Sequence, residues 1–284
     1  MGVGGRAWTP LHARLQRSLQ QSGLLDTGSV LVAVSGGQDS MCLLQALVDL
    51  QPRWRWRLGV VHCDHGWRPD SAANADFVAA WARALGLPCH VRAAAPGAVR
   101  GERAAREWRY GAFQEVAAAE GFGTVVTAHT ATDRAETLML NLLRGSGPDG
   151  LVALSRCRPL AAAPSGPHPE GASHGGTPLN GRHQAGGSGG AAAAGGVTLA
   201  RPLLEFTREE TAGFVRRLSL PYYHDTTNDL NDIRRNRLRN DVMPALRAGF
   251  NPQLDGALFR FLELLHADME FMDAVAERLY PQVR

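Results

Sequence analysis

The sequence predicts an α/β fold, a doubly wound and mostly parallel sheet, joined to a small C-terminal α-helical domain. Between residues 30 and 144, short runs of β-branched and aliphatic residues alternate with stretches of helical spacing. Turns rich in glycine or histidine follow three of these runs. From Asp232 onward the apolar residues recur with helical spacing alone. Alternation followed by pure helical spacing is typical of a parallel sheet covered by helices, with a separate helical unit behind it.

The first helix is opened by Thr9 and Pro10, which suit an N-cap and a first helical residue. Leu11, Leu15 and Leu19 then fall on one face of that helix. The alternation continues with strands at 30–34, 58–61, 89–91 and 124–127, and helices at 39–50, 71–86, 102–120 and 133–144. Parallel strands of this kind bind ligands at their carboxyl ends, where the loops 35–40, 62–68 and 128–133 lie.

Residues 161–196 are dominated by Ala, Gly, Pro and Ser. Such a segment buries too little apolar area to offset the entropy of ordering. We predict a disordered insertion without a catalytic role, inside a catalytic domain that spans residues 1–206. Thr207 and Glu210 have the spacing of a capping box, and we predict a second, helical domain over 207–284.

The composition excludes some chemistry. All 30 basic residues are arginine and the net charge is +3, so a lysyl adenylate or a Schiff base on the protein is excluded. The four cysteines form no C-x-x-C pair, which favours a reducing compartment without structural zinc. The longest apolar runs are too short to cross a membrane.

The hexapeptide 35–40, SGGQDS, joins the first strand to a helix. A glycine turn at the start of a helix brings backbone N–H groups together, which makes a phosphate cradle. An acid beside phosphates suits a helix cap or a ligand for Mg²⁺, a role that falls on Asp39. The alternative is an ordinary strand-to-helix turn. The residues that we expect to bind a nucleotide here are Ser35, Gly36, Gly37, Gln38, Asp39 and Ser40, joined by Asp64 and His65 from the next strand end.

Two acids, Asp133 and Glu136, follow His129 just after a strand end and share one helix face. Carboxylates in this position bind an ammonium group or a metal, or accept a proton, although acids in a first helical turn also simply favour the helix dipole. The pair Asp64–His65 has the same ambiguity, because such pairs at strand ends are often structural.

Two arginine groups are candidates for anion binding. Arg103, Arg106 and Arg109 recur every third residue of a helix, beside Tyr110. Later in the chain stand Arg234, Arg235, Arg237 and Arg239. Either group is a phosphate-binding surface or a solvated helix face.

Six motifs occur in order: SGGQDS, HCDHGWRPDS, ERAAREWRY, TAHTATDRAET, RGSGPDGL and RRNRLRNDVMP. Together they closely resemble those of bacterial and plastid tRNA(Ile)-lysidine synthetases, which are N-type ATP pyrophosphatases with a PP-motif. The resemblance covers about residues 24–155 and 197–250.

The resemblance implies a PP-loop fold like that of the adenine nucleotide alpha hydrolases, and a ligase that uses ATP with Mg²⁺. ATP would adenylate C2 of the wobble cytidine in a CAU-anticodon tRNA(Ile), and the ε-amine of free L-lysine would displace AMP. We assign catalytic roles to Asp39, Arg109, His129, Asp133 and Glu136, with Asp39 as metal ligand. Contacts with lysine or tRNA are assigned to Arg106, Arg109, His129, Asp133, Glu136, Arg235, Arg237 and Arg239. A homodimer is one assembly that the resemblance allows.

The chain also departs from the family pattern. Thr130 and Thr132 stand where a second histidine and a first aspartate are usual, which leaves His129, Asp133 and Glu136. The HCDHGWR motif is similar to cyanobacterial and plastid forms, so we expect a bacterial cytoplasm or, in an alga, the plastid stroma. Two alternatives remain: a PP-loop tRNA thiolation enzyme, which would need reactive cysteines, and a non-enzymatic nucleotide-binding module.

Overall fold

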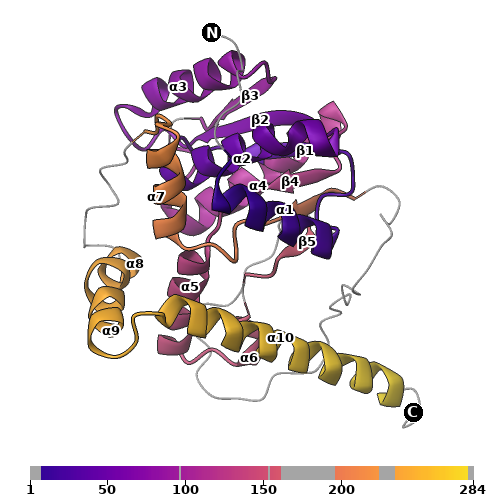
Figure 1. The fold of residues 1–284 in the computed structure, drawn as a ribbon, viewed down its shortest axis with the longest axis vertical. Coiled ribbons are helices and arrows are strands. Elements are labelled where there is room, and N and C mark those ends of the chain that lie inside the picture. Colours follow the sequence, from indigo (N-terminus) through magenta and orange to yellow (C-terminus); the bar gives the residue numbers. More distant parts are fainter. Residues whose placement is uncertain (1–7, 96, 153, 161–195, 224–233, 281–284) are drawn as a thin grey trace.

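One mixed sheet forms the centre of the molecule in a computed structural model that describes residues 8–95, 97–152, 154–160, 196–223 and 234–280 (Figure 1). Its strands are β1 (Ser29–Ala33), β2 (Arg57–Asp64), β3 (Cys89–Ala93), β4 (Thr124–Val126), β5 (Cys157–Pro159) and β6 (Thr198–Ala200). They lie in the order β3-β2-β1-β4-β6-β5, and every neighbouring pair is parallel except β5 with β6. The predicted doubly wound, mostly parallel sheet is thereby confirmed.

The helices of the sheet unit are α1 (Pro10–Ser22), α2 (Gln38–Trp54), α3 (Ser71–Ala84), α4 (Gly101–Glu120), α5 (Ala131–Leu143) and α6 (Pro148–Leu151). The later helices are α7 (Arg208–Arg217), α8 (Arg234–Arg237), a π-helical turn (Leu238–Val242), α9 (Met243–Gly249) and α10 (Leu254–Leu279). None of the described helices is both long and apolar enough to span a membrane.

The alternation of side chains along β1 divides the core into two layers. Val30 and Val32 pack with α1, α2, α3 and α7, whereas Leu31 packs on the other face with Phe113 and Val116 of α4. The order of the strands reverses between β1 and β4, and the carboxyl ends of the strands at such a switch point are where open α/β sheets bind ligands.

Three helix starts show how local sequence determines the elements. The Thr9 and Thr207 side chains both accept hydrogen bonds from N–H groups of the first turn, as the predicted N-cap of α1 and the predicted capping box of α7 require. The start of α5 was predicted at Asp133, but this helix begins at Ala131, because Thr130 caps it and Asp133 closes the capping box. Each such cap contributes about 1 kcal/mol to helix stability.

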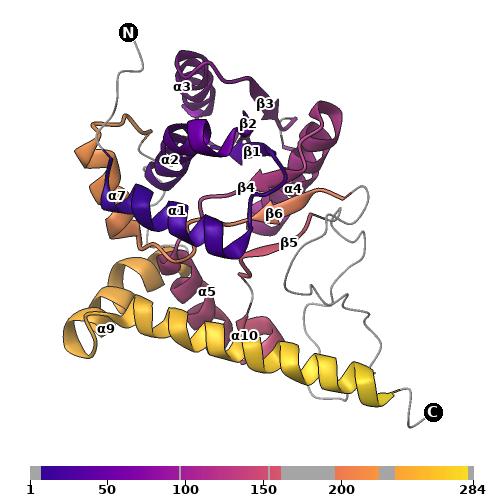
Figure 2. The same ribbon diagram turned by 45° about the vertical axis from the view of Figure 1, so that its right-hand side comes forward.

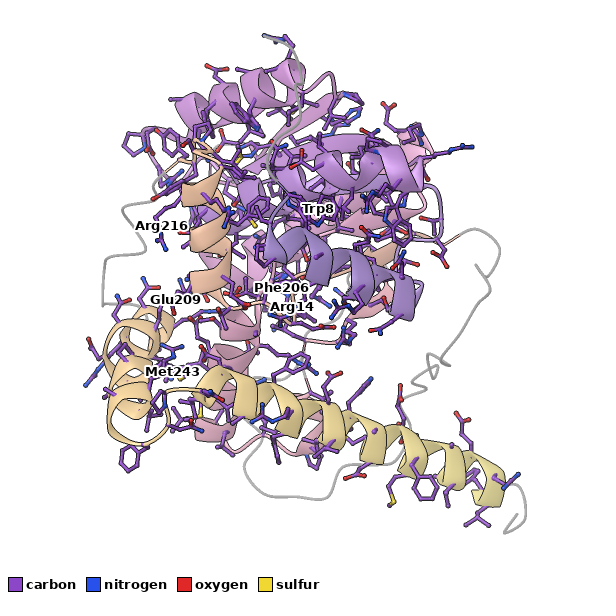
Figure 3. The ribbon with its side chains drawn as sticks, in the orientation of Figure 1. Trp8, Arg14, Phe206, Glu209, Arg216 and Met243 are labelled. Atoms are coloured by element: carbon purple, nitrogen blue, oxygen red, sulfur yellow. The ribbon has the colours of Figure 1, made fainter. Side chains whose placement is uncertain are left out.

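The helix α7 packs on the sheet unit. It lies against α2 and α1. Arg14 of α1 forms an ion pair with Glu210 of α7 (2.6 Å). The guanidinium of Arg14 also stacks on Phe206, which lies just before α7, at 4.4 Å from the ring centroid (Figure 3). The predicted domain boundary before residue 207 stays a prediction, as does the insertion, nearly all of which lies outside the described residues.

The C-terminal helices lie on the far side of α5 from the sheet (Figure 2). Met243 and Leu238 pack with Ala135 of α5 in a small apolar cluster. Arg134, also on α5 and 2% exposed, donates to Glu263 of α10 (2.5 Å). Thus one side of α5 carries the C-terminal helices, while its first turn faces the strand ends.

Candidate active site

The loop 35–40 has the geometry of an anion cradle. Gly36 has a φ of +89°, and a Cβ there would lie 2.1 Å from Oδ1 of Asn74, so the position requires glycine. Gly37 is the N-cap of α2 and provides no side chain to satisfy the N–H groups of the first turn. Ser35 donates its hydroxyl to Ser40 (3.1 Å). Free N–H groups at a helix start favour a bound anion, as the sequence predicts.

Asp39 does not cap its helix. Its Oδ2 accepts a hydrogen bond from Nε of Arg208 (3.1 Å), and its Oδ1 accepts one from the hydroxyl of Thr211. Burial raises the pKa of Asp39 above its usual value, although Arg208 and Thr211 oppose this rise. The same guanidinium reaches Oδ1 of Asp133 through Nη2 (3.4 Å), so Arg208 bridges two carboxylates from opposite sides of the switch point.

Asp133 is held by the start of α5. Its Oδ2 accepts hydrogen bonds from the backbone N–H (2.9 Å) and hydroxyl (2.8 Å) of Thr130. Burial raises the pKa of Asp133, but Arg208 and these hydrogen bonds outweigh burial and hold the pKa below its usual value. The helix-capping role that the sequence left open is therefore present, and it leaves Oδ1 facing the site.

The ring of His129 stands at the end of β4, where its Nδ1 lies 2.9 Å from the hydroxyl of Thr127. Burial lowers the pKa of His129, and the positive charges of Arg201 and Arg109 lower it further against the attraction of Asp133. A neutral imidazole at neutral pH can accept a proton.

Glu136 is completely buried and is paired with two arginines. Arg239 donates from Nε to Oε1 and from Nη2 to Oε2, both at 2.7 Å, and Arg235 donates from Nε to Oε2 at 3.2 Å. Arg235 and Arg239 also lie 3.7 Å and 3.5 Å from Oδ1 of Asp133. The two acids thus form one anionic site that binds cationic groups, and two of the predicted tRNA-contacting arginines point into it.

Arg237 and Arg234, by contrast, are exposed. The arginine run of α8 and the π-helical turn therefore has two sides: one pairs with the acids of α5, and the other remains accessible to a ligand.

The end of β2 carries the predicted pair Asp64 and His65. Asp64 accepts a hydrogen bond from N–H of Gly66 (2.7 Å), which shapes the turn. The ring of His65 contacts Trp67 and Trp108, with centroids 5.3 Å and 5.0 Å away. Burial, together with the charge of Arg109, lowers the pKa of His65 to about 4. Both residues lie at the same sheet edge as the loop, as predicted for parallel strands.

Several residues at the site were not expected from the sequence. Arg208 and Thr211 of α7 bind Asp39, and Asn74 of α3 donates to the carbonyl of Ser35 (2.9 Å). Thr132, one of the departures from the family pattern, accepts a hydrogen bond from N–H of Arg208 (3.1 Å). The capping-box pattern at Thr207 was the available signal, because it places Arg208 at the first position of a helix.

Three of the four cysteines are unsuited to sulfur transfer. All four are free thiols. Burial raises the pKa of the Cys42, Cys63 and Cys89 thiols, that of Cys63 to about 12. A thiol must lose its proton to act as a nucleophile, so these three resist the chemistry that the thiolation alternative requires.

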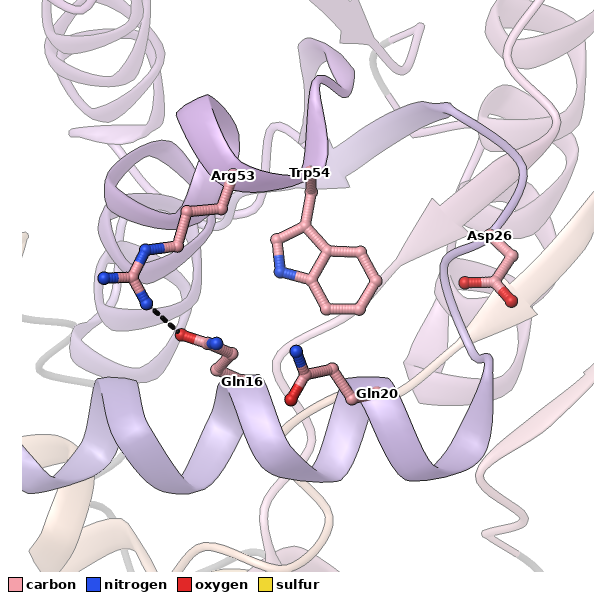
Figure 4. Close-up of a pocket in the computed structure, with 5 residues that line it drawn as sticks. All are labelled: Gln16, Gln20, Asp26, Arg53 and Trp54. Carbon is pink, nitrogen blue, oxygen red and sulfur yellow. Dashed lines mark hydrogen bonds between the residues drawn. The ribbon is translucent and has the colours of Figure 1, made fainter.

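A hollow of about 320 Å³ lies between α1 and the last turn of α2, lined by Gln16, Gln20, Asp26, Arg53 and Trp54 (Figure 4). Arg53 donates to Gln16 there (2.7 Å). The phosphate cradle lies at the other end of α2, and the 17 residues of this helix span about 25 Å at 1.5 Å per residue. The hollow is therefore separate from the site at the switch point.

Comparisons with known proteins show the family to which the chain belongs. A tRNA(Ile)-lysidine synthase from Nostoc sp. is 42% identical over 273 residues, which cover 96% of this chain and 70% of the relative. One from Thermosynechococcus vestitus is 44% identical over 277 residues, covering 97% of this chain and 70% of the relative. The U34-tRNA thiolase NcsA from Methanococcus maripaludis has a similar fold, with a TM-score of 0.64 and 14% identity over 89% of this chain and 78% of that chain. A family model for the PP-loop domain matches residues 9–246. The chain belongs to the PP-loop family and, within it, to the tRNA(Ile)-lysidine synthases.

Proposed function

We propose that this chain ligates L-lysine to C2 of the wobble cytidine of a CAU-anticodon tRNA(Ile), using ATP and releasing AMP and pyrophosphate. The observation that carries the proposal is the pairing of an anion cradle after β1 with a buried, cation-binding acid pair after β4. The reaction needs both halves, because it releases an anion and consumes an amino acid that carries two ammonium groups.

In the first step the cytidine attacks the α-phosphate of ATP. The N–H groups at the start of α2, with the hydroxyls of Ser35 and Ser40, receive the departing pyrophosphate. Gln38 borders the same cradle, and Asp64 and His65 remain candidate nucleotide contacts from the neighbouring strand end.

A magnesium ion fits the same place. Arg208 bridges Asp39 and Asp133, so two carboxylates already share one cation there. Mg²⁺ is usually held by one or two carboxylates together with phosphate oxygens. Asp39 would hold the ion together with phosphate oxygens, and the ion would neutralise charge on the phosphates.

In the second step the ε-amine of lysine attacks C2 of the adenylated cytidine. An alkylammonium has a solution pKa near 10.4 and must lose a proton before attack. Asp133 and Glu136 can hold one ammonium group of lysine, while the neutral ring of His129 can accept the proton of the other. Arg109, which lies close enough to lower the pKa of His129, disfavours a lasting imidazolium. The guanidinium groups of Arg235 and Arg239 now fill the acid pair, so lysine must share or displace them.

The decisive experiment is incubation with ATP, labelled lysine and CAU-anticodon tRNA(Ile). Label should enter the tRNA with one pyrophosphate released per lysine transferred. As a discriminator, a variant with all four cysteines replaced by serine should transfer lysine like the wild type, whereas a thiolation enzyme would lose its chemistry with the fold intact. A module that only binds the nucleotide would release no pyrophosphate.

The cyanobacterial relatives support a location in a bacterial cytoplasm or a plastid stroma, and a homodimer stays a prediction. Arg106 and Arg237 remain candidate contacts with the tRNA.

A further inference from the structure

Three arginines approach the side chain of Tyr110 on the α4 side of the strand ends, and a fourth, Arg109, precedes Tyr110 in the helix. Arg106 and Arg109 come from α4, Arg158 from β5, and Arg201 directly follows β6. The guanidinium carbons of Arg106 and Arg158 lie 5.4 Å and 5.1 Å from the ring centroid of Tyr110. Within the described part of the chain, none of these four arginines forms an ion pair with a carboxylate. This cluster therefore differs from the arginines of α7 and α8, which face acids.

The deepest members of the cluster carry N–H groups without partners. Arg201 is 1% exposed, its Nη1 donates to the carbonyl of Ser155 (2.6 Å), and its guanidinium lies next to the hydroxyl of Tyr110. Its Nε and Nη2 nevertheless complete no hydrogen bond of good geometry with the described residues. The buried Nε of Arg109 likewise has none. Leaving a buried charged donor unsatisfied is costly, and an anion bound beside Arg201 and Tyr110 would satisfy the N–H groups of Arg201.

The pKa of Tyr110 also indicates a positive potential at the cluster. Burial raises the pKa of its hydroxyl, but the guanidinium groups of Arg106, Arg201 and Arg158 outweigh burial and lower the pKa below its usual value. The positive potential at this hydroxyl is thus strong enough to favour a negative charge.

The position of the cluster separates it from the phosphate cradle. The residues of α4 pack on the opposite face of β1 from those of α2. The ring of His129 is close to both groups, since the charges of Asp133, Arg201 and Arg109 all act on it. An anion at the cluster is therefore distinct from the pyrophosphate at the start of α2. Arg106 is exposed, so the ligand can extend from the buried guanidinium of Arg201 out to solvent.

We infer that Arg106, Arg109, Arg158 and Arg201, with the hydroxyl of Tyr110, bind a backbone phosphodiester of the RNA strand beside the reacting nucleotide. The inference rests on the proposed function for the identity of the polymer. An RNA strand matches the arrangement because it has one phosphate per nucleotide, continues beyond the site, and places its base toward His129 while the guanidinium groups bind its backbone.

The test uses the full chain with Arg106 and Arg158 both replaced by glutamine, because their guanidinium groups lie over the Tyr110 ring and neither residue is buried. The matched control is Arg103→Gln, one turn earlier on α4, whose guanidinium pairs with Glu107 (2.9 Å). A fluorescent CAU anticodon stem-loop is titrated at several salt concentrations, and ATP binding is measured in parallel. The double variant should bind the stem-loop about tenfold more weakly, and its slope of log K against log salt should flatten by about 0.7 for one single-strand phosphate. The control and the affinity for ATP should be unchanged.

A second readout follows Tyr110 itself. Binding of the stem-loop should raise the pKa of one tyrosine, seen in the ultraviolet absorbance of phenolate, and Tyr110→Phe should remove this signal. Unchanged RNA affinity and salt slope in a folded double variant would overturn the site. A loss of ATP affinity with intact RNA binding would also overturn it, and would reassign the cluster to the α-phosphate of the nucleotide. Wild-type protein that binds the stem-loop through the cluster yet transfers no lysine would support the site and refute the proposed function.

Discussion

Arg239 holds both carboxylate oxygens of Glu136 at 2.7 Å, although 103 residues separate them in the sequence. Glu136 is fully buried, and a buried ion pair that loses one partner costs about 3 to 5 kcal/mol. The pair therefore does two things at once: it joins the C-terminal helices to α5, and it shows that the site accepts a cation. Predictions about Glu136 must separate these roles.

Asp133→Asn and Glu136→Gln should abolish lysine incorporation while ATP and tRNA binding stay near wild type. Each change removes a negative charge from the subsite proposed for an ammonium group, so the KM for lysine should rise where binding is the main loss. Steady-state assays with labelled lysine measure this effect, with the exposed Glu209→Gln as control. If both variants instead used lysine normally but no longer bound ATP, the acids would be magnesium ligands and the proposed division of the site would be wrong.

Asp39→Ala and Ser40→Ala should each eliminate ATP-dependent pyrophosphate release, because both side chains border the site proposed for the phosphates and magnesium. Asp26→Ala, an exposed acid beside the remote hollow, serves as the control and should release pyrophosphate normally. Normal release by both site variants would refute the nucleotide assignment.

Replacing Arg235, Arg237 and Arg239 together with glutamine should flatten the salt slope of tRNA binding by about 2.7 if each neutralises one phosphate. Because Arg235 and Arg239 pair with Glu136, the exposed Arg237 is the best candidate of the three for a contact with a tRNA phosphate. Arg237→Gln alone should flatten the slope by about 0.9 and leave the KM for lysine unchanged. A slope equal to that of the wild type would identify Arg237 as part of a solvated face.

The stability provided by Glu263 should depend on pH. Burial raises the pKa of this carboxyl, but the guanidinium groups of Arg134 and Arg156 outweigh burial and hold the pKa below the usual 4.5. Its contribution is therefore present above pH 4.5 and is lost as the pH falls through the lowered pKa. Glu263→Gln should lower the Tm at pH 7 by about 2–4 °C, because the group is partly solvated and contributes about 1 kcal/mol.

The same comparison at a pH below the lowered pKa should show no difference between Glu263→Gln and wild type. Glu270→Gln is the control on the same helix, since Glu270 is exposed and pairs with His266 at 3.3 Å. A Tm difference that persisted in acid would mean that Glu263 acts through packing and not through charge.

Replacing residues 162–195 with a short Gly–Ser linker should leave activity and Tm close to those of the full chain. N–H of Leu160 donates to the carbonyl of Val197 (2.8 Å), and β5 pairs with β6 next to this bond. The two ends of the segment already lie side by side, so a short connection closes without strain. Thermal unfolding and the lysine assay test this expectation, and a large loss of activity alone would show that the segment contacts tRNA.

Local signals in the sequence predicted what local physics determines. The capping residues Thr9 and Thr207, the valines of β1 and the glycine turn at Gly36 each act within a few residues, so their effects can be read from short windows. The edge of the sheet where the site lies also followed from the alternation of strands and helices.

Long-range pairing could not be predicted in the same way. Nothing near Glu136 indicates that Arg239 will bind it, and nothing near Asp39 points to Arg208, which follows it by 169 residues. The sequence also could not divide the run at 234–239 into paired and exposed arginines, because that division depends on how α8 and the π-helical turn approach α5.

The bridge made by Arg208 has a practical consequence for handling the protein. Two neighbouring carboxylates, Asp39 and Asp133, already share a counter-ion that belongs to the chain. A chelator therefore removes the divalent ion proposed for the reaction, but Arg208 still neutralises the two carboxylates. Purification and storage in EDTA should preserve the fold, and activity should return as soon as divalent ions are supplied.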